Sequence, residues 1–168
     1  MTWNAYNRRK EVLREMLAIA DQRRNDITLT DLLDTVDGGR EVFSNETELL
    51  FDMQMNWFQR LSGQLDRLLI ESEDTPEIMA VTAWVNAASE MPGARALLDA
   101  EVNNPALRKA FAKELTLLAT SAGVPLNHPD VNGHGKRLRD AANDSVVTVD
   151  DVADEAPRSG SLLSRLRS

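Results

Sequence analysis

One long stretch, residues 44–71, constrains the fold of this chain more than any other part of its sequence. It reads SNETELLFDMQMNWFQRLSGQLDRLLIE and carries apolar residues at helical spacing. Two adjoining rows result, one of Phe51, Phe58, Leu65 and Leu68 and one of Leu50, Met53, Trp57 and Leu61. Because neighbours on several sides must cover an apolar arc this broad, the pattern predicts a long helix at the centre of the fold.

The rest of the sequence predicts shorter helices separated by capping and breaking residues. We expect them at 3–24, 30–36, 76–89, 94–101 and 104–123, with cap-then-proline starts at Thr75-Pro76 and Asn104-Pro105. Prolines and glycines between 124 and 142 predict a loop with a helical turn at 136–142. The expected fold class is therefore all-α, with about six helices packed around the long central helix 44–71.

Composition divides the chain into a helical domain, residues 1–142, and two short segments. Residues 143–157 hold five acids and no base, so we interpret residues 143–160 as an acidic flexible linker. In the last segment, residues 161–168, a helix would place Leu162, Leu163 and Leu166 on one face and Arg165 and Arg167 on the other. We expect this end to be a disordered, amphipathic basic tail that docks on a protein partner of unknown identity and becomes helical when bound. A tail with no role is the alternative.

Charge and composition exclude several classes of partner. The net charge of −8 opposes binding to phosphate backbones, so no specific nucleic acid is expected. No apolar run approaches the roughly 18–20 residues that a bilayer span requires, which argues against integral membrane association. The chain has no cysteine, as is common in a reducing compartment, and we expect it in the cytoplasm.

Only one cluster has the chemistry of metal ligands, namely His128, Asp130 and His134. Its spacing across proline and glycine matches no metal motif, and we interpret it as a loop that caps neighbouring helices. There is no glycine-rich phosphate loop and no nucleophile elbow. We therefore expect no metal, no cofactor and no catalysis; an enzyme with an unrecognised site around these histidines is the remaining alternative.

Four large apolar residues of the long helix, Phe51, Met55, Trp57 and Phe58, could line a pocket or an interface instead of ordinary core. A helix of 28 residues, about 42 Å long, is hard for a domain of this size to cover completely, so homodimerisation through it is also possible. Gly63 lies inside this helix and predicts either a mild bend or, more favourably, the close approach of another helix.

Residues 8–71 resemble the start of a tetracycline-repressor family regulator. The series RKEVLREMLAIADQR, TLTDLLDTV and VFSNETELLFDMQ follows that family's first helix, second helix and entry into a long helix. The resemblance implies a transcriptional regulator or a small-ligand sensor that dimerises. Where the family has its turn and recognition helix, residues 37–42 read only DGGREV, so the DNA-binding unit is shortened and lacks a row of polar side chains.

The interpretation that follows is a non-catalytic helical interaction or regulatory protein that acts by binding another protein. The alternative is a regulator or sensor of the tetracycline-repressor type with a reduced DNA-binding unit. A basic surface would distinguish that alternative, and its members would be Arg8, Arg9, Lys10, Arg23, Arg24 and Arg40.

Overall fold

The computed structural model describes the backbone of residues 1–154 and the side chains of residues 1–146. The described part contains eight α-helices, two short 3₁₀ helices and no strand, so the all-α expectation is confirmed. The α-helices are α1 (Trp3–Arg23), α2 (Leu29–Thr35), α3 (Gly39–Val42), α4 (Glu46–Glu71), α5 (Pro76–Glu90), α6 (Pro92–Ala100), α7 (Arg108–Ser121) and α8 (Val131–Asp154). The 3₁₀ helices are η1 (Arg24–Asp26) and η2 (Pro105–Leu107).

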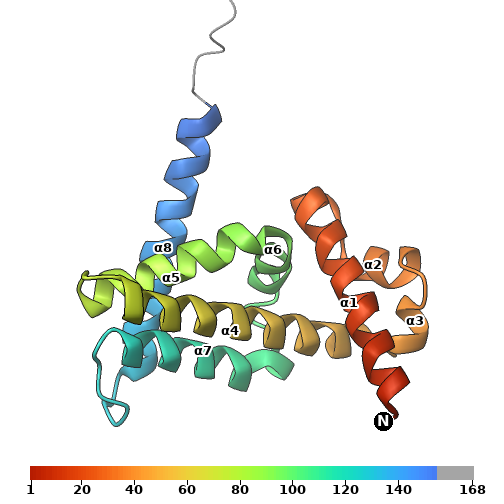
Figure 1. Cartoon of the computed structure of the whole chain (residues 1–168), viewed down its shortest axis with the longest axis horizontal. Helices are drawn as coiled ribbons and strands as arrows, with labels where there is room; N and C mark the ends of the chain where they lie inside the picture. Colours follow the sequence, from red (N-terminus) through yellow and green to blue (C-terminus); the bar gives the residue numbers. More distant parts are fainter. Residues whose placement is uncertain (155–168) are drawn as a thin grey trace, which may run out of the picture.

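The helices are arranged along α4, which lies across the molecule in Figure 1. At its N-terminal end α4 contacts α1 and α2, and α3 packs against these two helices. Farther along, α4 contacts α5, α6 and α7, and α8 packs against α5 and α7. Because α6 contacts both α1 and α4, it joins the two groups of helices over one continuous core.

Local signals explain where α4 begins and which side of it is buried. The sequence offers Ser44 or Asn45 as the cap of this helix, and in the structure the side-chain oxygen of Asn45 accepts a hydrogen bond from the backbone N–H of Glu48 at 3.0 Å. Of the two predicted apolar rows, the one containing Met53 and Trp57 is fully buried. The other row begins with Phe51, whose side chain is 43% exposed. The fold therefore covers only part of the apolar arc.

The predicted count of six helices is too low, because the sequence analysis missed α3 and α8. Glycine in residues 124–142 suggested a loop, yet Gly135 lies inside α8, where a Cβ atom would come 2.0 Å from the carbonyl oxygen of Leu115 in α7. This glycine permits the close crossing of two helices instead of breaking one. The helix α8 also continues through residues 143–154, where we expected a flexible linker. The expected tail, residues 161–168, lies outside the described residues.

A second close crossing joins α1 to α6. A Cβ atom on Gly93 would lie 2.1 Å from the carbonyl carbon and oxygen of Ala20, so only glycine fits at this contact. The carboxylate of Asp21 accepts a hydrogen bond from the N–H of Gly93 at 2.9 Å and holds the start of α6 against α1. Gly63, by contrast, has open space where a Cβ atom would stand. The expectation of close packing at Gly63 is therefore wrong.

Candidate functional site

An open apolar groove lies between α4 and α7. Its lining comes from Phe51, Gln54, Met55, Phe58 and Gln59 of α4 and from Ala110 and Lys113 of α7, and its volume is about 450 Å³. We call it the α4–α7 groove. Phe51, Met55 and Phe58 follow one another at i, i+4 and i+7, so helical geometry places them in a row along one face of α4. The only ionisable group in this lining is Lys113.

A second hollow continues the groove toward the N-terminus. It lies between α1 and α4, has a volume of about 290 Å³, and includes Met1, Tyr6, Arg9, Lys10 and Asp52. We call it the α1–α4 hollow. Because Met55 and Gln59 line both cavities, the groove and the hollow adjoin at these two residues. Together they form one trough whose floor is α4 and whose walls are α1 and α7.

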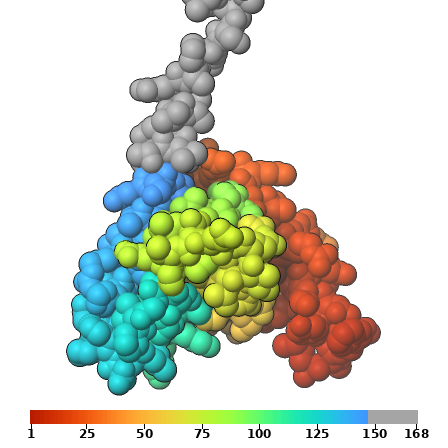
Figure 2. Space-filling view, turned by 60° about the vertical axis from the view of Figure 1, so that its left-hand side comes forward, coloured from red at the N-terminus to blue at the C-terminus, as the bar shows by residue number. Residues whose placement is uncertain are grey.

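The trough leaves large apolar side chains exposed. Met55 is 60% exposed and Tyr6 is 43% exposed. Trp3 lies outside the lining, but its ring centroid is 6.0 Å from that of Tyr6 and its side chain is 74% exposed. Figure 2 shows the side view, in which a notch separates the red N-terminal segment from the yellow and teal parts of the chain. Contiguous apolar exposure rimmed by polar residues is typical of a binding surface.

The structure brings together three of the four residues that the sequence singled out on the long helix. Phe51, Met55 and Phe58 line the α4–α7 groove, but Trp57 does not. Trp57 is fully buried, and its indole N–H donates a hydrogen bond of 2.6 Å to the carboxylate of Glu114. One residue along a helix turns the side chain by about 100°, which places Trp57 in the core while Phe58 stays at the groove. Trp57 is therefore a core residue.

Beneath the groove lies a buried polar network that the sequence analysis missed. Arg95 of α6 packs against the rings of Trp57 and Trp84, 4.5 Å and 5.0 Å from their centroids. Its guanidinium lies 3.1 Å from the carboxylate of Glu114, which is only 2% exposed. The indole N–H of Trp84 donates to the side-chain oxygen of Asn143 in α8 at 2.9 Å. The network thus connects α4, α5, α6, α7 and α8.

Gln54 connects this network to the floor of the groove. Its side-chain nitrogen donates a hydrogen bond to Glu114 at 3.1 Å, and its side chain also lines the α4–α7 groove. Its side-chain oxygen is buried and has no hydrogen-bond partner among the described residues. The hydrogen bond to Glu114 therefore fixes the position of the Gln54 amide, which lines the groove beside Met55 and Phe58.

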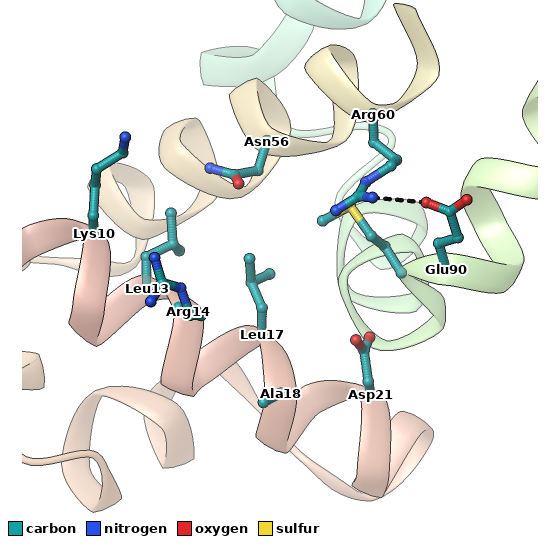
Figure 3. Close-up of a pocket in the computed structure, with 10 residues that line it drawn as sticks. Lys10, Leu13, Arg14, Leu17, Ala18, Asp21, Asn56, Arg60 and Glu90 are labelled. Carbon is teal, nitrogen blue, oxygen red and sulfur yellow. Dashed lines mark hydrogen bonds and ion pairs between the residues drawn. The ribbon is translucent and has the colours of Figure 1, made fainter. Parts of the chain in front are cut away.

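A third cavity, of about 360 Å³, lies between α1, α4 and the junction of α5 with α6. Figure 3 shows Lys10 and Arg14 on one side of it and the ion pair of Arg60 with Glu90, 2.8 Å apart, on the other. Asp21 faces this cavity, and burial raises the pKa of its carboxyl although the N–H of Gly93 opposes the shift. Both carboxylates in the lining are thus already engaged in contacts between helices.

Three of the six basic residues that would form a DNA-binding surface pair with acidic side chains. Arg8 pairs with Asp37 at 3.2 Å, Arg9 with Asp52 at 2.7 Å and Arg40 with Asp34 at 2.7 Å. The hydrogen bonds that Arg9 donates to the carboxylate of Asp52 raise the pKa of Arg9 above its ordinary value. These pairs neutralise Arg8, Arg9 and Arg40, whereas Lys10, Arg23 and Arg24 form no ion pair among the described residues.

The predicted histidine cluster does gather at the start of α8. The rings of His128 and His134 meet edge to face with centroids 4.9 Å apart, and the ring nitrogen Nδ1 of His128 accepts from the N–H of Asp130. The carboxylate of Asp130, however, pairs with Arg137 at 3.4 Å. Among the described residues no group of three or more metal-ligating side chains could hold an ion. These contacts stabilise the loop that leads into α8 and the first turns of that helix.

The predicted tail residues, Leu162, Leu163, Arg165, Leu166 and Arg167, lie outside the described residues. Within residues 1–154 no helix is long and apolar enough to cross a bilayer. Comparison of the chain with protein-family models, with curated proteins and with solved structures finds no match.

Proposed function

We propose that this chain is a non-catalytic interaction or regulatory protein that acts by binding another protein in the trough along α4. The single observation that carries this proposal is the row of Phe51, Met55 and Phe58, which lines an open groove of about 450 Å³. Leaving such a row in water has an unfavourable free energy, and a partner that covered it would recover that free energy.

The ionisation of the described side chains supports a binding role over a catalytic one. A shifted pKa is found for Arg9, Asp21, Asp31 and Arg40. The shifts of Arg9 and Arg40 come from surface ion pairs, and that of Asp31 comes from the capping box with Thr28 at the start of α2. Asp21 is shifted by burial at the contact of α1 with α6. Each shift has a structural cause, so none calls for a catalytic group.

The experiment is affinity capture from a lysate of the source cell with wild type and with Phe51→Ser/Met55→Ser. A matched control is Leu69→Ser/Ile70→Ser, because these two residues are exposed on the same helix but lie outside the trough. We expect the first variant to lose the captured proteins and the control to retain them. Capture of the same proteins by wild type and both variants would refute the proposal. If wild type captures a second copy of this chain and the Phe51→Ser/Met55→Ser variant does not, the chain homodimerises through α4.

The basic tail is proposed as a second contact with the same partner or another one. Its three leucines would contribute only a few kcal/mol after ordering costs, so it needs the rest of the chain to raise its effective concentration. The test compares captured partners and membrane fractions of wild type and Leu162→Glu/Leu166→Glu. Unchanged inventories would show that the tail is not a docking segment.

The alternative function is a tetracycline-repressor-like regulator or small-ligand sensor with a reduced DNA-binding unit. The succession of α1, α2, a turn, α3 and the long α4 favours it. Against DNA reading stand the four-residue length of α3 and the ion pairs of Arg8, Arg9 and Arg40. A salt-sensitive, sequence-selective shift of duplex DNA at nanomolar protein would establish this alternative, and we expect no such shift.

A further inference from the structure

The geometry of the trough indicates what kind of segment fits it. Phe51, Met55 and Phe58 extend over about two turns of α4, or about 10 Å at 1.5 Å per residue. Through Met55 the apolar surface continues to Tyr6 and Met1. An open, elongated apolar row between two helices is the type of surface that accepts the apolar face of a third helix.

The charges of the trough differ from those of the whole chain. The net charge of the chain is −8, yet the ionisable side chains that line the trough are Arg9, Lys10, Lys113 and Asp52. Arg9 and Asp52 form an ion pair of 2.7 Å and cancel each other. Lys10 and Lys113 have no carboxylate partner among the described residues. The trough is therefore a locally positive surface on an acidic protein.

The two unpaired lysines lie on both sides of Met55. The ammonium group of Lys10 stands 5.0 Å from the centroid of the Tyr6 ring in the α1–α4 hollow. That of Lys113 stands 5.1 Å from the centroid of the Phe58 ring in the α4–α7 groove. Both cations thus remain next to the apolar row, where acids flanking a docked apolar face can reach them.

We propose that the trough binds an acidic amphipathic helix of a partner protein. The apolar side chains of that helix would pack on Phe51, Met55 and Phe58, and its carboxylates would pair with Lys10 and Lys113. This inference rests on the proposed binding function and specifies the chemistry of the partner.

Charge also separates this occupant from two others. A two-fold contact of the trough with a second copy places the same unpaired lysines on both sides of the interface, and like charges there are unfavourable. The end of this chain, residues 158–168, carries three arginines and no acid, so it lacks the charge that the lysines require. An acidic segment from a different protein satisfies both the apolar row and the lysines. Docking of the acidic end of α8 from a second copy would appear as the dimer that the test below detects.

The test measures fluorescence anisotropy of two labelled synthetic peptides with the full chain. Both peptides have about 18 residues, enough for a marginal helix, and the same leucine face. One carries glutamate at the flanking positions and the other carries lysine. We expect the glutamate peptide to bind at least about tenfold more tightly than the lysine peptide, with an affinity that falls as salt rises.

Three variants make the result specific. Met55→Ser should lower the affinity for the glutamate peptide by about tenfold or more, whereas Leu69→Ser should leave that affinity unchanged. Lys10→Glu/Lys113→Glu should reverse the preference between the peptides. Because all four side chains are exposed, circular dichroism should give each variant the wild-type helical spectrum.

Several results would overturn the inference. These are equal affinity for both peptides, insensitivity to Met55→Ser, or a dimer that Met55→Ser dissociates in sedimentation. Binding of dodecanoate with no binding of either peptide would assign the groove to small amphiphiles instead. If the capture of proteins depends on Phe51 and Met55 but the two peptides bind equally, the proposed function stands and only the proposed acidic chemistry of the partner is wrong. If capture is independent of the trough, the proposed function itself fails.

Discussion

The guanidinium of Arg95 lies 3.1 Å from the carboxylate of Glu114, and both side chains are buried between helices. Arg95 packs against the indole of Trp57, and Glu114 accepts the N–H of that indole. Glu114→Ala leaves the buried Arg95 with only the half-exposed Asp99, 2.8 Å away, as an acid partner. It also removes the acceptor of the Trp57 indole N–H and of the Gln54 amide. We therefore expect Glu114→Ala to lower the free energy of unfolding by roughly 2–4 kcal/mol in chemical denaturation.

The double variant Arg95→Met/Glu114→Ala is the matched control for this pair. Methionine retains apolar contact with the two indoles and removes the stranded charge. We expect the double variant to lose less stability than the sum of Arg95→Met and Glu114→Ala. Strict additivity would show that the two groups do not interact.

Trp57 and Phe58 are neighbours in sequence but differ in burial. Trp57→Ala should lower the free energy of unfolding by roughly 3–5 kcal/mol, because a fully buried aromatic leaves a cavity. Phe58→Ala should lower it by only roughly 1–2 kcal/mol, since this half-buried ring lines the groove. Urea titrations of the two variants check the difference, and equal losses would contradict the placement of Phe58 at an open surface.

Gly93 and Gly63 should respond in opposite directions to alanine. Gly93→Ala forces a methyl group against the carbonyl of Ala20 and should cost roughly 1–3 kcal/mol by overpacking α1 against α6. Gly63→Ala adds its methyl group in open space inside α4 and should stabilise by about 1 kcal/mol through helix propensity. Thermal unfolding measures both, and a stabilised Gly93→Ala would refute the close crossing.

Asp21 should make stability depend on pH in a defined direction. Burial raises the pKa of its carboxyl in the folded protein, so folding favours the protonated form. Its contribution is fully present below the ordinary pKa and is lost as pH rises through the folded pKa. We expect Asp21→Asn to gain stability relative to wild type as pH rises across that window. A difference between the two proteins that is flat with pH would contradict the raised pKa.

The sequence predicts those parts of the fold that depend on local signals. Thr75 caps α5 as expected, and of the two candidate caps of α4, Ser44 and Asn45, it is Asn45 that caps the helix, because a cap is set by a residue and the three that follow it. The helical period of α4 likewise identifies its apolar rows. It does not reveal which row is covered, since that depends on how α5, α6 and α7 pack against α4.

The misses have a common physical cause in contacts between distant segments. Gly135 is read as a helix breaker in sequence, but its role is set by Leu115 across the crossing of α7 with α8. The sequence analysis did not single out Arg95 and Glu114, although each is flanked at helical spacing by core residues. A charge on an apolar stripe is the one signal that would have indicated their buried pairing. For the groove, Phe51, Met55 and Phe58 were selected from residue type alone, and Lys113 was missed.

The most direct test of the account is photo-crosslinking from a single position in the trough. A benzoylphenylalanine introduced at Met55, and at Leu69 as control, is irradiated in the source cell, and adducts are resolved by mass. We expect position 55 to yield an adduct with a second, different protein through an acidic helical segment, and position 69 to yield none. Adducts of equal yield from both positions, or no adduct from position 55, would contradict the claim that the trough along α4 is where this protein binds its partner.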